Sequence, residues 1–224
     1  GVEGLEIITG EKIWEIEPNL SRNVKAVLYA PTGAIICPFK LTIALAENAN
    51  VNGVEFAFDT EVKNIQKTEN GYEIETTKGC YETKCIVNAA GVYADVFHNM
   101  VSEEKLFITP RRGEYCLMDK KAGSFVSHTI FQLPTAMGKG VLITPTVHGN
   151  LLAGPTAENI EDKEGINTTG EGIAKLSQMA KLSAENIPLN MVITSFAGLR
   201  AAEKGGDFVL GEVFDAPGFF DAAG

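Results

Sequence analysis

The stretch Cys85-Ile-Val-Asn-Ala-Ala-Gly-Val-Tyr-Ala-Asp95 decides the fold of this chain. It begins with the apolar pair Ile86 and Val87, typical of a buried strand, and continues into three positions with little or no side chain, Ala89 to Gly91. A backbone that carries such small side chains can approach a ligand or a neighbouring strand closely. The stretch therefore indicates either a strand end that faces a nucleotide or a buried strand that ends in a tight turn.

The segments before this stretch favour the nucleotide interpretation. Residues 38–49 begin with proline, carry apolar side chains at helical spacing and are followed by Gly53, which predicts a helix. Val54–Phe58 and Glu61–Lys67 are predicted as short strands, and Asn70-Gly71 predicts a hairpin with a type I′ turn. A helix, a small antiparallel meander and a glycine-ended strand are typical of the middle of a flavoprotein nucleotide-binding domain.

The phosphate loop of such a domain is missing from the sequence. A dinucleotide-binding fold has Gly-x-Gly-x-x-Gly at the start of a helix after its first strand, and none of the 23 glycines supplies this motif. We therefore expect that the chain by itself binds no dinucleotide cofactor.

The character of the chain changes at about residue 106. Short apolar segments separated by Gly and Pro predict an antiparallel sheet. The predicted strands are Leu106–Pro110, Glu114–Met118, Val126–Phe131, Gly140–Thr144 and Asn150–Ala153. A helix follows, with Thr168-x-x-Glu171 as its capping box. Its apolar stripe is predicted to be core, and consists of Ile173, Leu176, Met179 and Leu182.

Seven motifs together resemble a known family over nearly the whole length of the chain. They are Glu17-Pro-Asn-Leu20, Pro31-Thr-Gly-Ala-Ile-Ile-Cys-Pro38, Val87-Asn-Ala-Ala-Gly-Val-Tyr-Ala-Asp95, Pro110-Arg-Arg-Gly-Glu-Tyr115, Pro145-Thr-Val-His-Gly-Asn150, Gly154-Pro-Thr-Ala157 and Phe196-Ala-Gly-Leu-Arg200. In this order they resemble the FAD-dependent oxidoreductases of the D-amino-acid-oxidase (DAO) type, in the branch of glycerol-3-phosphate dehydrogenase and L-2-hydroxyglutarate oxidase.

The resemblance implies an α/β (α+β) fold and an internal piece of a longer enzyme. Residues 1–35 and 107–195 would form an antiparallel-sheet substrate domain. Residues 36–106 and 196–224 would be the remnant of a Rossmann-like FAD-binding domain. The implied reaction is hydride transfer to FAD from glycerol 3-phosphate or a similar small anionic 2-hydroxy compound. L-2-hydroxyglutarate and amino acids stay open as substrates, as does a role of the isolated chain in binding or assembly without turnover.

The resemblance also implies roles for individual residues. Arg200 matches the position that holds the substrate anion, and a guanidinium suits this role because its planar fork binds carboxylate or phosphate in a bidentate manner. The alternative for Arg200 is an ion pair with a surface acid such as Glu203. Arg112 is a second substrate-binding candidate, with bracing of a strand end as the alternative, and Arg111 is expected to be solvated. His148 is a candidate proton acceptor or a structural loop histidine. The cofactor-binding candidates are Val62, Asn88, Ala89, Ala90 and Gly91, and for Asn88 the alternative is a cap or a tie between adjacent strands.

Composition limits the possible partners. The 224 residues are 45% hydrophobic and carry a formal net charge of −10, and no basic cluster is present to attract nucleic acid. The four cysteines lack zinc spacing, so we expect free thiols and no metal site. No apolar run is long enough to span a bilayer. We expect a cytoplasmic protein with a small anionic substrate and an unidentified electron acceptor, and peripheral membrane association of the full-length protein stays open.

Overall fold

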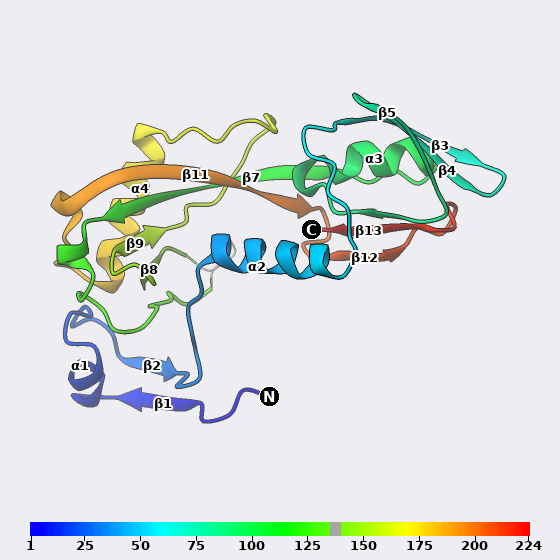
Figure 1. The fold of residues 1–224 in the computed structure, drawn as a ribbon. Coiled ribbons are helices and arrows are strands. Elements are labelled where there is room, and N and C mark those ends of the chain that lie inside the picture. Colours follow the sequence, from blue (N-terminus) through cyan, green and yellow to red (C-terminus); the bar gives the residue numbers. More distant parts are fainter. Residues whose placement is uncertain (135–139) are drawn as a thin grey trace. The chain divides into compact units, whose positions relative to one another are not determined.

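The computed structural model describes residues 1–134 and 140–224, which form two compact units (Figure 1). The first unit consists of Gly1–Val51, Gly113–Ala157 and Ile166–Gly198, and the second of Asn52–Arg112, Glu158–Gly165 and Leu199–Gly224. Two long strands, β7 (Ile108–Met118) and β11 (Val192–Glu203), contribute residues to both units. The assignment of a substrate domain and an FAD domain to these parts of the chain stays a prediction.

The first unit is built on antiparallel strands packed against one long helix. Strands β7, β9 (Leu151–Gly154) and β8 (Leu142–Pro145) pair in this order, and β11 also pairs with β7. The short strand β10 (Glu158–Asn159) of the second unit extends the same sheet, since it pairs with Arg111 and Arg112 of β7. Leu176 of the helix α4 is fully buried in the main core of this unit, and Ile173 and Met179 pack against that core. The remaining elements are β1 (Glu6–Thr9), α1 (Lys12–Ile16), β2 (Ala26–Tyr29), α2 (Pro38–Val51), η2 (Lys120–Ala122), β8 (Leu142–Pro145), β9 (Leu151–Gly154), α4 (Gly170–Ser183) and η3 (Leu189–Met191).

The second unit contains the meander and the glycine-ended strand that the sequence predicts. Strands β3, β4 and β5 pair in sequence order, and β6 pairs in parallel with β13, which in turn pairs with β12. Its core includes Tyr72 and Phe219, and the Tyr72 hydroxyl donates to the carbonyl oxygen of Pro217 at 2.9 Å. The elements are β3 (Val62–Thr68), β4 (Gly71–Thr76), β5 (Gly79–Thr83), β6 (Ile86–Asn88), η1 (Gly91–Tyr93), α3 (Ala94–Val101), β10 (Glu158–Asn159), β12 (Val209–Glu212) and β13 (Phe219–Ala223).

Two of the predicted strands are absent. Val54–Phe58 belongs to no sheet of the described residues, and Phe56 instead stacks on Phe58 with ring centroids 5.8 Å apart. Val126–Phe131 makes only the isolated bridge between Ile130 and Ile143. Here the backbone N–H groups of Ser127 and His128 both donate to the Glu17 carboxylate at 2.8 Å. A carboxylate therefore takes the donors that a sheet ladder would use.

Two further predicted strands, Leu106–Pro110 and Glu114–Met118, are one continuous strand, β7. Gly113 does not interrupt it, because its φ is not positive. A Cβ atom at Gly113 would lie 2.9 Å from Cβ of Pro155, so glycine permits a close approach of two chain segments here instead of a turn.

The first residue of α4 and the set of its buried side chains also differ from the prediction. The N-cap is Thr169, whose hydroxyl accepts from the N–H of Gly172 at 3.0 Å, and not Thr168. Leu182 is 64% exposed. A step of three residues turns the side chain back by about 60° around a helix with 3.6 residues per turn. Three such steps place Leu182 on the side opposite Ile173.

The hairpin between β3 and β4 forms, but its turn is not of type I′. That turn requires positive φ at both central residues. The loop here consists of Glu69 and Asn70, neither of which has positive φ, and Gly71 begins β4 with a φ of 147°. A Cβ atom at Gly71 would collide with the carbonyl oxygen of Thr83, which explains the glycine.

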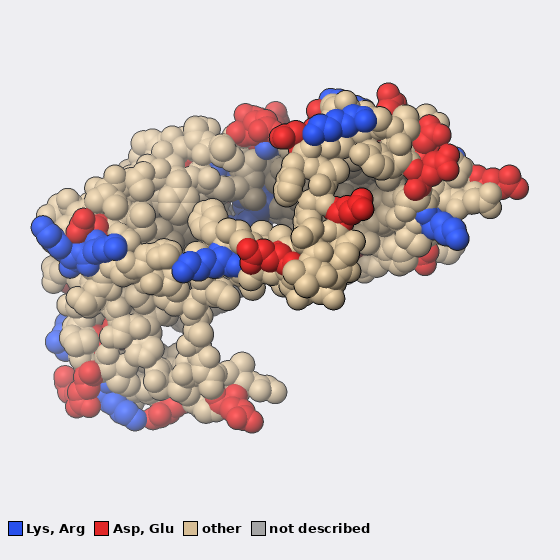
Figure 2. Space-filling view, in the orientation of Figure 1, with Lys and Arg blue, Asp and Glu red and all other residues tan. Residues whose placement is uncertain are grey.

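The helix at 38–49 is confirmed as α2, but it buries none of its residues in the described part of the chain. Phe39 is 78% and Leu45 61% exposed. Figure 2 shows that the surface drawn around α2 carries few charged side chains, whereas acidic groups gather over the β3–β5 meander. None of the helices in the described ranges combines the length and apolarity that crossing a membrane requires.

Candidate functional site

A buried polar network joins the ends of β6 and β13. The Asn88 amide nitrogen donates to Asp221 Oδ1 and to the Ala94 carbonyl, both at 2.8 Å. His98 Nδ1 lies 2.5 Å from Asp221 Oδ2, and His98 Nε2 lies 2.8 Å from the carbonyl oxygen of Glu104. Because a carbonyl oxygen only accepts, His98 Nε2 is the donor in its contact with Glu104. The network fixes the two strand ends against α3.

A cavity of about 160 Å³ lies beside this network. Four of the predicted cofactor residues line it, namely Val62, Asn88, Ala89 and Ala90. The fifth, Gly91, follows directly with a φ of 59°, and a Cβ atom there would meet open space. The Asn88 Oδ1 atom is buried and has no hydrogen-bond partner among the described residues. The cavity thus combines apolar walls with a bare backbone, and Asn88, one of its lining residues, has a buried acceptor without a described partner.

The residues that follow β6, including Tyr93 and Asp95, are held in place by hydrogen bonds and an ion pair. Asp95 Oδ2 accepts from the N–H of Ile108 at 3.1 Å, and Asp95 Oδ1 accepts from Lys163 Nζ. The Tyr93 hydroxyl donates to Glu164, and this hydrogen bond is the main cause that raises the pKa of Tyr93 above its usual value. Residues 158–165 are thereby tied to η1 and α3.

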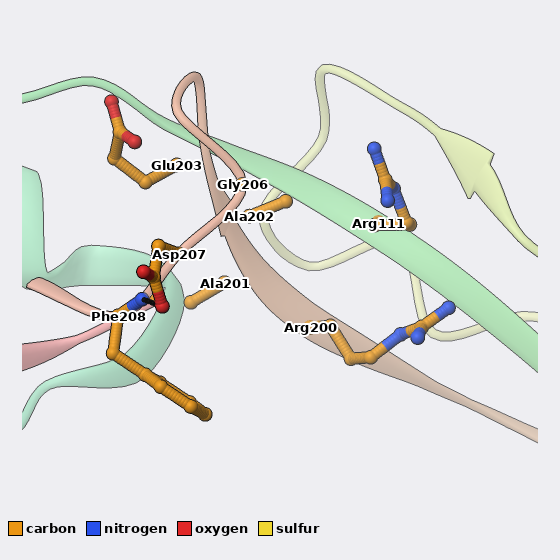
Figure 3. A pocket seen from close by; sticks show the side chains of 9 residues that line it. Arg111, Arg200, Ala201, Ala202, Glu203, Gly206, Asp207 and Phe208 are labelled. Carbon is orange, nitrogen blue, oxygen red and sulfur yellow. Dashed lines mark hydrogen bonds between the residues drawn. The ribbon is translucent and has the colours of Figure 1, made fainter. Parts of the chain in front are cut away.

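Arg200 lines a second, more polar pocket of the same unit, of about 320 Å³ (Figure 3). Its walls come from β7, from the end of β11 and the turn that follows it, and from Gly224 at the end of β13. The lining residues are Arg111, Arg200, Ala201, Ala202, Glu203, Gly206, Asp207, Phe208 and Gly224. Arg200 is exposed and has no hydrogen-bond or carboxylate partner in residues 1–134 and 140–224. A guanidinium in this state is available to an anion.

The other two predicted residues do not line this pocket. Arg112 is 8% exposed and donates from Nη2 to Glu158 Oε2 at 2.7 Å, across the β7–β10 pair. This contact supports the alternative in which Arg112 braces a strand. His148 lies in the exposed turn between β8 and β9 and lines neither cavity.

Sequence reasoning missed Arg111, which it expected to be solvated. Arg111 is half-buried and lines the pocket together with Arg200. Successive side chains of a strand point to opposite faces. Because Arg111 and Arg112 are consecutive residues of one strand, the sequence could have predicted that their side chains lie on opposite faces of the sheet.

Comparison with known proteins places the chain in a family. The sequence profile of the DAO family, described as FAD dependent oxidoreductase, matches residues 1–224. The chain belongs to this family. It is a DAO-family chain that is 53% identical, over its full length, to a glycerol 3-phosphate dehydrogenase of Caloramator mitchellensis, of which it covers 47%. It is 30% identical to a glycerol 3-phosphate oxidase of Mycoplasma pneumoniae over 97% of this chain and 58% of that protein.

Solved structures of the DAO family have the same fold. The L-α-glycerophosphate oxidase of Mycoplasma pneumoniae, with FAD bound, matches all of this chain and 60% of its own with a TM-score of 0.90 at 30% identity. Glycine oxidase of Geobacillus kaustophilus matches 99% of this chain and 58% of its own with a TM-score of 0.87 at 25% identity. The chain spans about half the length of the curated relatives it matches. The expected mixed α/β class and family are therefore confirmed.

The cavity beside β6 fits part of the cofactor on which this family depends. A nucleotide carries hydroxyl donors, and Asn88 Oδ1 is a buried acceptor without a described partner. The small side chains of Ala89 and Ala90 and the open space at Gly91 leave the backbone accessible. These residues fit a portion of FAD.

Proposed function

We propose that the full-length protein oxidises glycerol 3-phosphate with FAD as cofactor. The observation that carries this proposal is the 53% identity, over all of this chain, to a protein named glycerol 3-phosphate dehydrogenase. The guanidinium of Arg200 supports it, because this group lines a pocket, has no partner among the described residues, and the substrate is a small anion.

In this proposal the second unit supplies the nucleotide-binding surface. Val62, Asn88, Ala89, Ala90 and Gly91 hold a portion of FAD, and the His98–Asp221–Asn88 network keeps the strand ends in place. FAD, when bound, supplies the hydride acceptor.

Arg200 holds the phosphate of the substrate in the pocket at the end of β11. Its contribution is orientation: a fixed phosphate limits the positions of the carbon that loses the hydride. Arg200 moves no proton itself, since a guanidinium stays charged at all ordinary pH values.

The decisive experiment is the reductive half-reaction of the purified full-length protein loaded with FAD. Mixing with glycerol 3-phosphate in the absence of oxygen should remove the oxidised-flavin absorption, and no electron acceptor needs to be known. Glycine and L-2-hydroxyglutarate, mixed in parallel, should reduce the flavin far more slowly. Rapid reduction by either of these compounds, with none by glycerol 3-phosphate, would refute the proposal.

A further inference from the structure

The four arginines of the chain differ in whether they have an acidic partner. Arg22 lies 4.0 Å from a carboxylate oxygen of Glu11, and Arg112 lies 2.7 Å from one of Glu158. Arg111 and Arg200 have no carboxylate partner in the described ranges 1–134 and 140–224. These two arginines are also the two that line the 320 Å³ pocket.

The side chain of Arg111 is held with its outer nitrogens available. Its Nε donates to Asn159 Oδ1 at 2.8 Å, and Asn159 is its register partner in β10. This contact holds the guanidinium by its inner nitrogen. The two Nη groups have no hydrogen bond to the described residues and are therefore available to an anion. An arginine positioned in this way loses little further side-chain freedom when it binds an anion.

Both guanidinium groups line the pocket, and they come from the adjacent strands β7 and β11. Figure 3 draws Arg111 and Arg200 in one half of the view, and Glu203 and Asp207 in the other. The two acids are engaged by their own turn: Glu203 accepts the N–H of Gly205, and Asp207 accepts that of Phe208. The pocket therefore contains two basic groups whose charge no carboxylate of the described residues neutralises by a direct contact.

We propose that Arg111 is a second anion-binding residue, which with Arg200 makes this pocket specific for a phosphate dianion over a carboxylate. A carboxylate has one charge and two oxygens, which one guanidinium satisfies in a bidentate manner. A phosphate ester has up to two charges and three terminal oxygens, and so engages two guanidinium groups. This inference rests on the proposed function, since it names the group that distinguishes the substrate of the same pocket.

The test measures inorganic phosphate binding directly on the FAD-loaded full-length protein, by calorimetry, with glycerate as the carboxylate probe. Arg111→Ala should weaken phosphate binding by about tenfold to a hundredfold, the range for losing hydrogen bonds to a charged group. Its effect on glycerate binding should be less than about threefold. Arg111→Lys should restore part of the phosphate affinity, because it returns the charge without the fork. Arg22→Ala is the matched control and should change neither affinity.

Kinetics separate this inference from the proposed function. With glycerol 3-phosphate as substrate, Arg111→Ala should raise KM by the same factor and leave the FAD content unchanged. Unaltered phosphate affinity in Arg111→Ala, or an equal loss for phosphate and glycerate, overturns the role of Arg111 even if the wild type oxidises glycerol 3-phosphate. A wild type that binds phosphate through Arg111 but is not reduced by glycerol 3-phosphate overturns the proposed function alone.

Discussion

At the scale of single residues, side-chain partners distinguish structural from functional candidates. Arg112 and Arg200 both match family motifs, yet Arg112 is buried against Glu158, whereas Arg200 lines a pocket and has no partner in the described part of the chain. The motif predicts the type of residue and its position along the strand. It does not predict that β10 pairs with β7, which brings Glu158 opposite Arg112. Arg111 escaped prediction for the same reason, because Asn159 and Arg200 become its neighbours only in the folded sheet.

We predict that Arg200→Ala in the full-length enzyme lowers kcat/KM for glycerol 3-phosphate by about a hundredfold or more. Hydrogen bonds to a charged group contribute about 1.5–3 kcal/mol each, and about 1.4 kcal/mol corresponds to a factor of ten. Arg200→Lys should fall between wild type and Arg200→Ala, and the FAD content of both variants should equal that of the wild type. Steady-state kinetics of the two variants measure this effect. A kcat/KM near the wild-type value in Arg200→Ala would show that Arg200 does not bind the substrate.

The buried pair of His98 and Asp221 should be important for stability. Asp221 is 4% exposed, so Asp221→Ala leaves His98 and Asn88 buried without their shared acceptor. Removal of one partner of a buried pair costs about 3–5 kcal/mol, and we expect a decrease in the free energy of unfolding of this size. The exposed histidine is the control: His148→Ala should stay within about 0.5 kcal/mol of wild type. Urea denaturation measures both, and similar small changes in the two variants would contradict the role of the network.

At the scale of elements, periodicity predicted the two 14-residue helices but not the shorter α1 and α3, and it predicted the strands only in part. The helices α2 and α4 occur where apolar spacing and flanking Pro or Gly indicate them. Val126–Phe131 has strand-like composition, but its N–H groups bind Glu17, which is more than a hundred residues away in sequence. A contact between residues so far apart in the sequence cannot be predicted from the local residue pattern. The cap of α4 was displaced by one residue for a similar reason, since the Thr169 hydroxyl also donates to the buried Glu114 at 2.9 Å.

Two glycines of α4 should respond oppositely to alanine. A Cβ atom at Gly172 would collide with the Glu114 carboxylate, which is 1% exposed and has little room to move. Gly172→Ala should therefore destabilise the chain by about 1–3 kcal/mol, as overpacking does. A Cβ atom at Gly170 meets nothing within 4 Å, so Gly170→Ala should be neutral or stabilise by up to about 1 kcal/mol. Thermal unfolding of both variants tests the packing of Glu114 under the helix start, and equal shifts in Tm would argue against it.

The end of α3 should make stability depend on pH in the acid range. Asp215 accepts from the N–H of Glu103 at 2.7 Å and from the Ser102 hydroxyl at 2.8 Å, and these hydrogen bonds lower its pKa below the ordinary 3.8. A lowered folded-state pKa contributes stability that is present above pH 3.8 and is lost as the pH falls through the lower folded value. Asp215→Asn should flatten this part of the stability curve, measured by urea denaturation between neutral and acid pH. An unchanged slope below pH 3.8 would show that the contact has no energetic weight.

At the scale of the whole molecule, family and fold are better determined than activity. The family match covers all 224 residues, whereas the chain covers only 47% of the glycerol 3-phosphate dehydrogenase it resembles. The motifs around Asn88 and Arg200 could be recognised in the sequence because they are continuous segments. The arrangement of the two cavities could not, because each is lined by segments that are distant along the chain.

The last prediction concerns FAD binding by the 224-residue chain on its own. The pyrophosphate of a dinucleotide is normally neutralised by backbone N–H groups and the dipole of a helix that follows a Gly-x-Gly-x-x-Gly loop, and no glycines in this chain form that loop. The cavity of about 160 Å³ beside Asn88 provides contacts to a portion of the cofactor only. We therefore expect the purified chain to lack a stoichiometric flavin spectrum, while the full-length protein, purified in parallel as the control, shows one. A stoichiometric flavin spectrum from the 224 residues alone would mean that the contacts around Asn88 and Gly91 suffice for binding, and that the phosphate loop is dispensable.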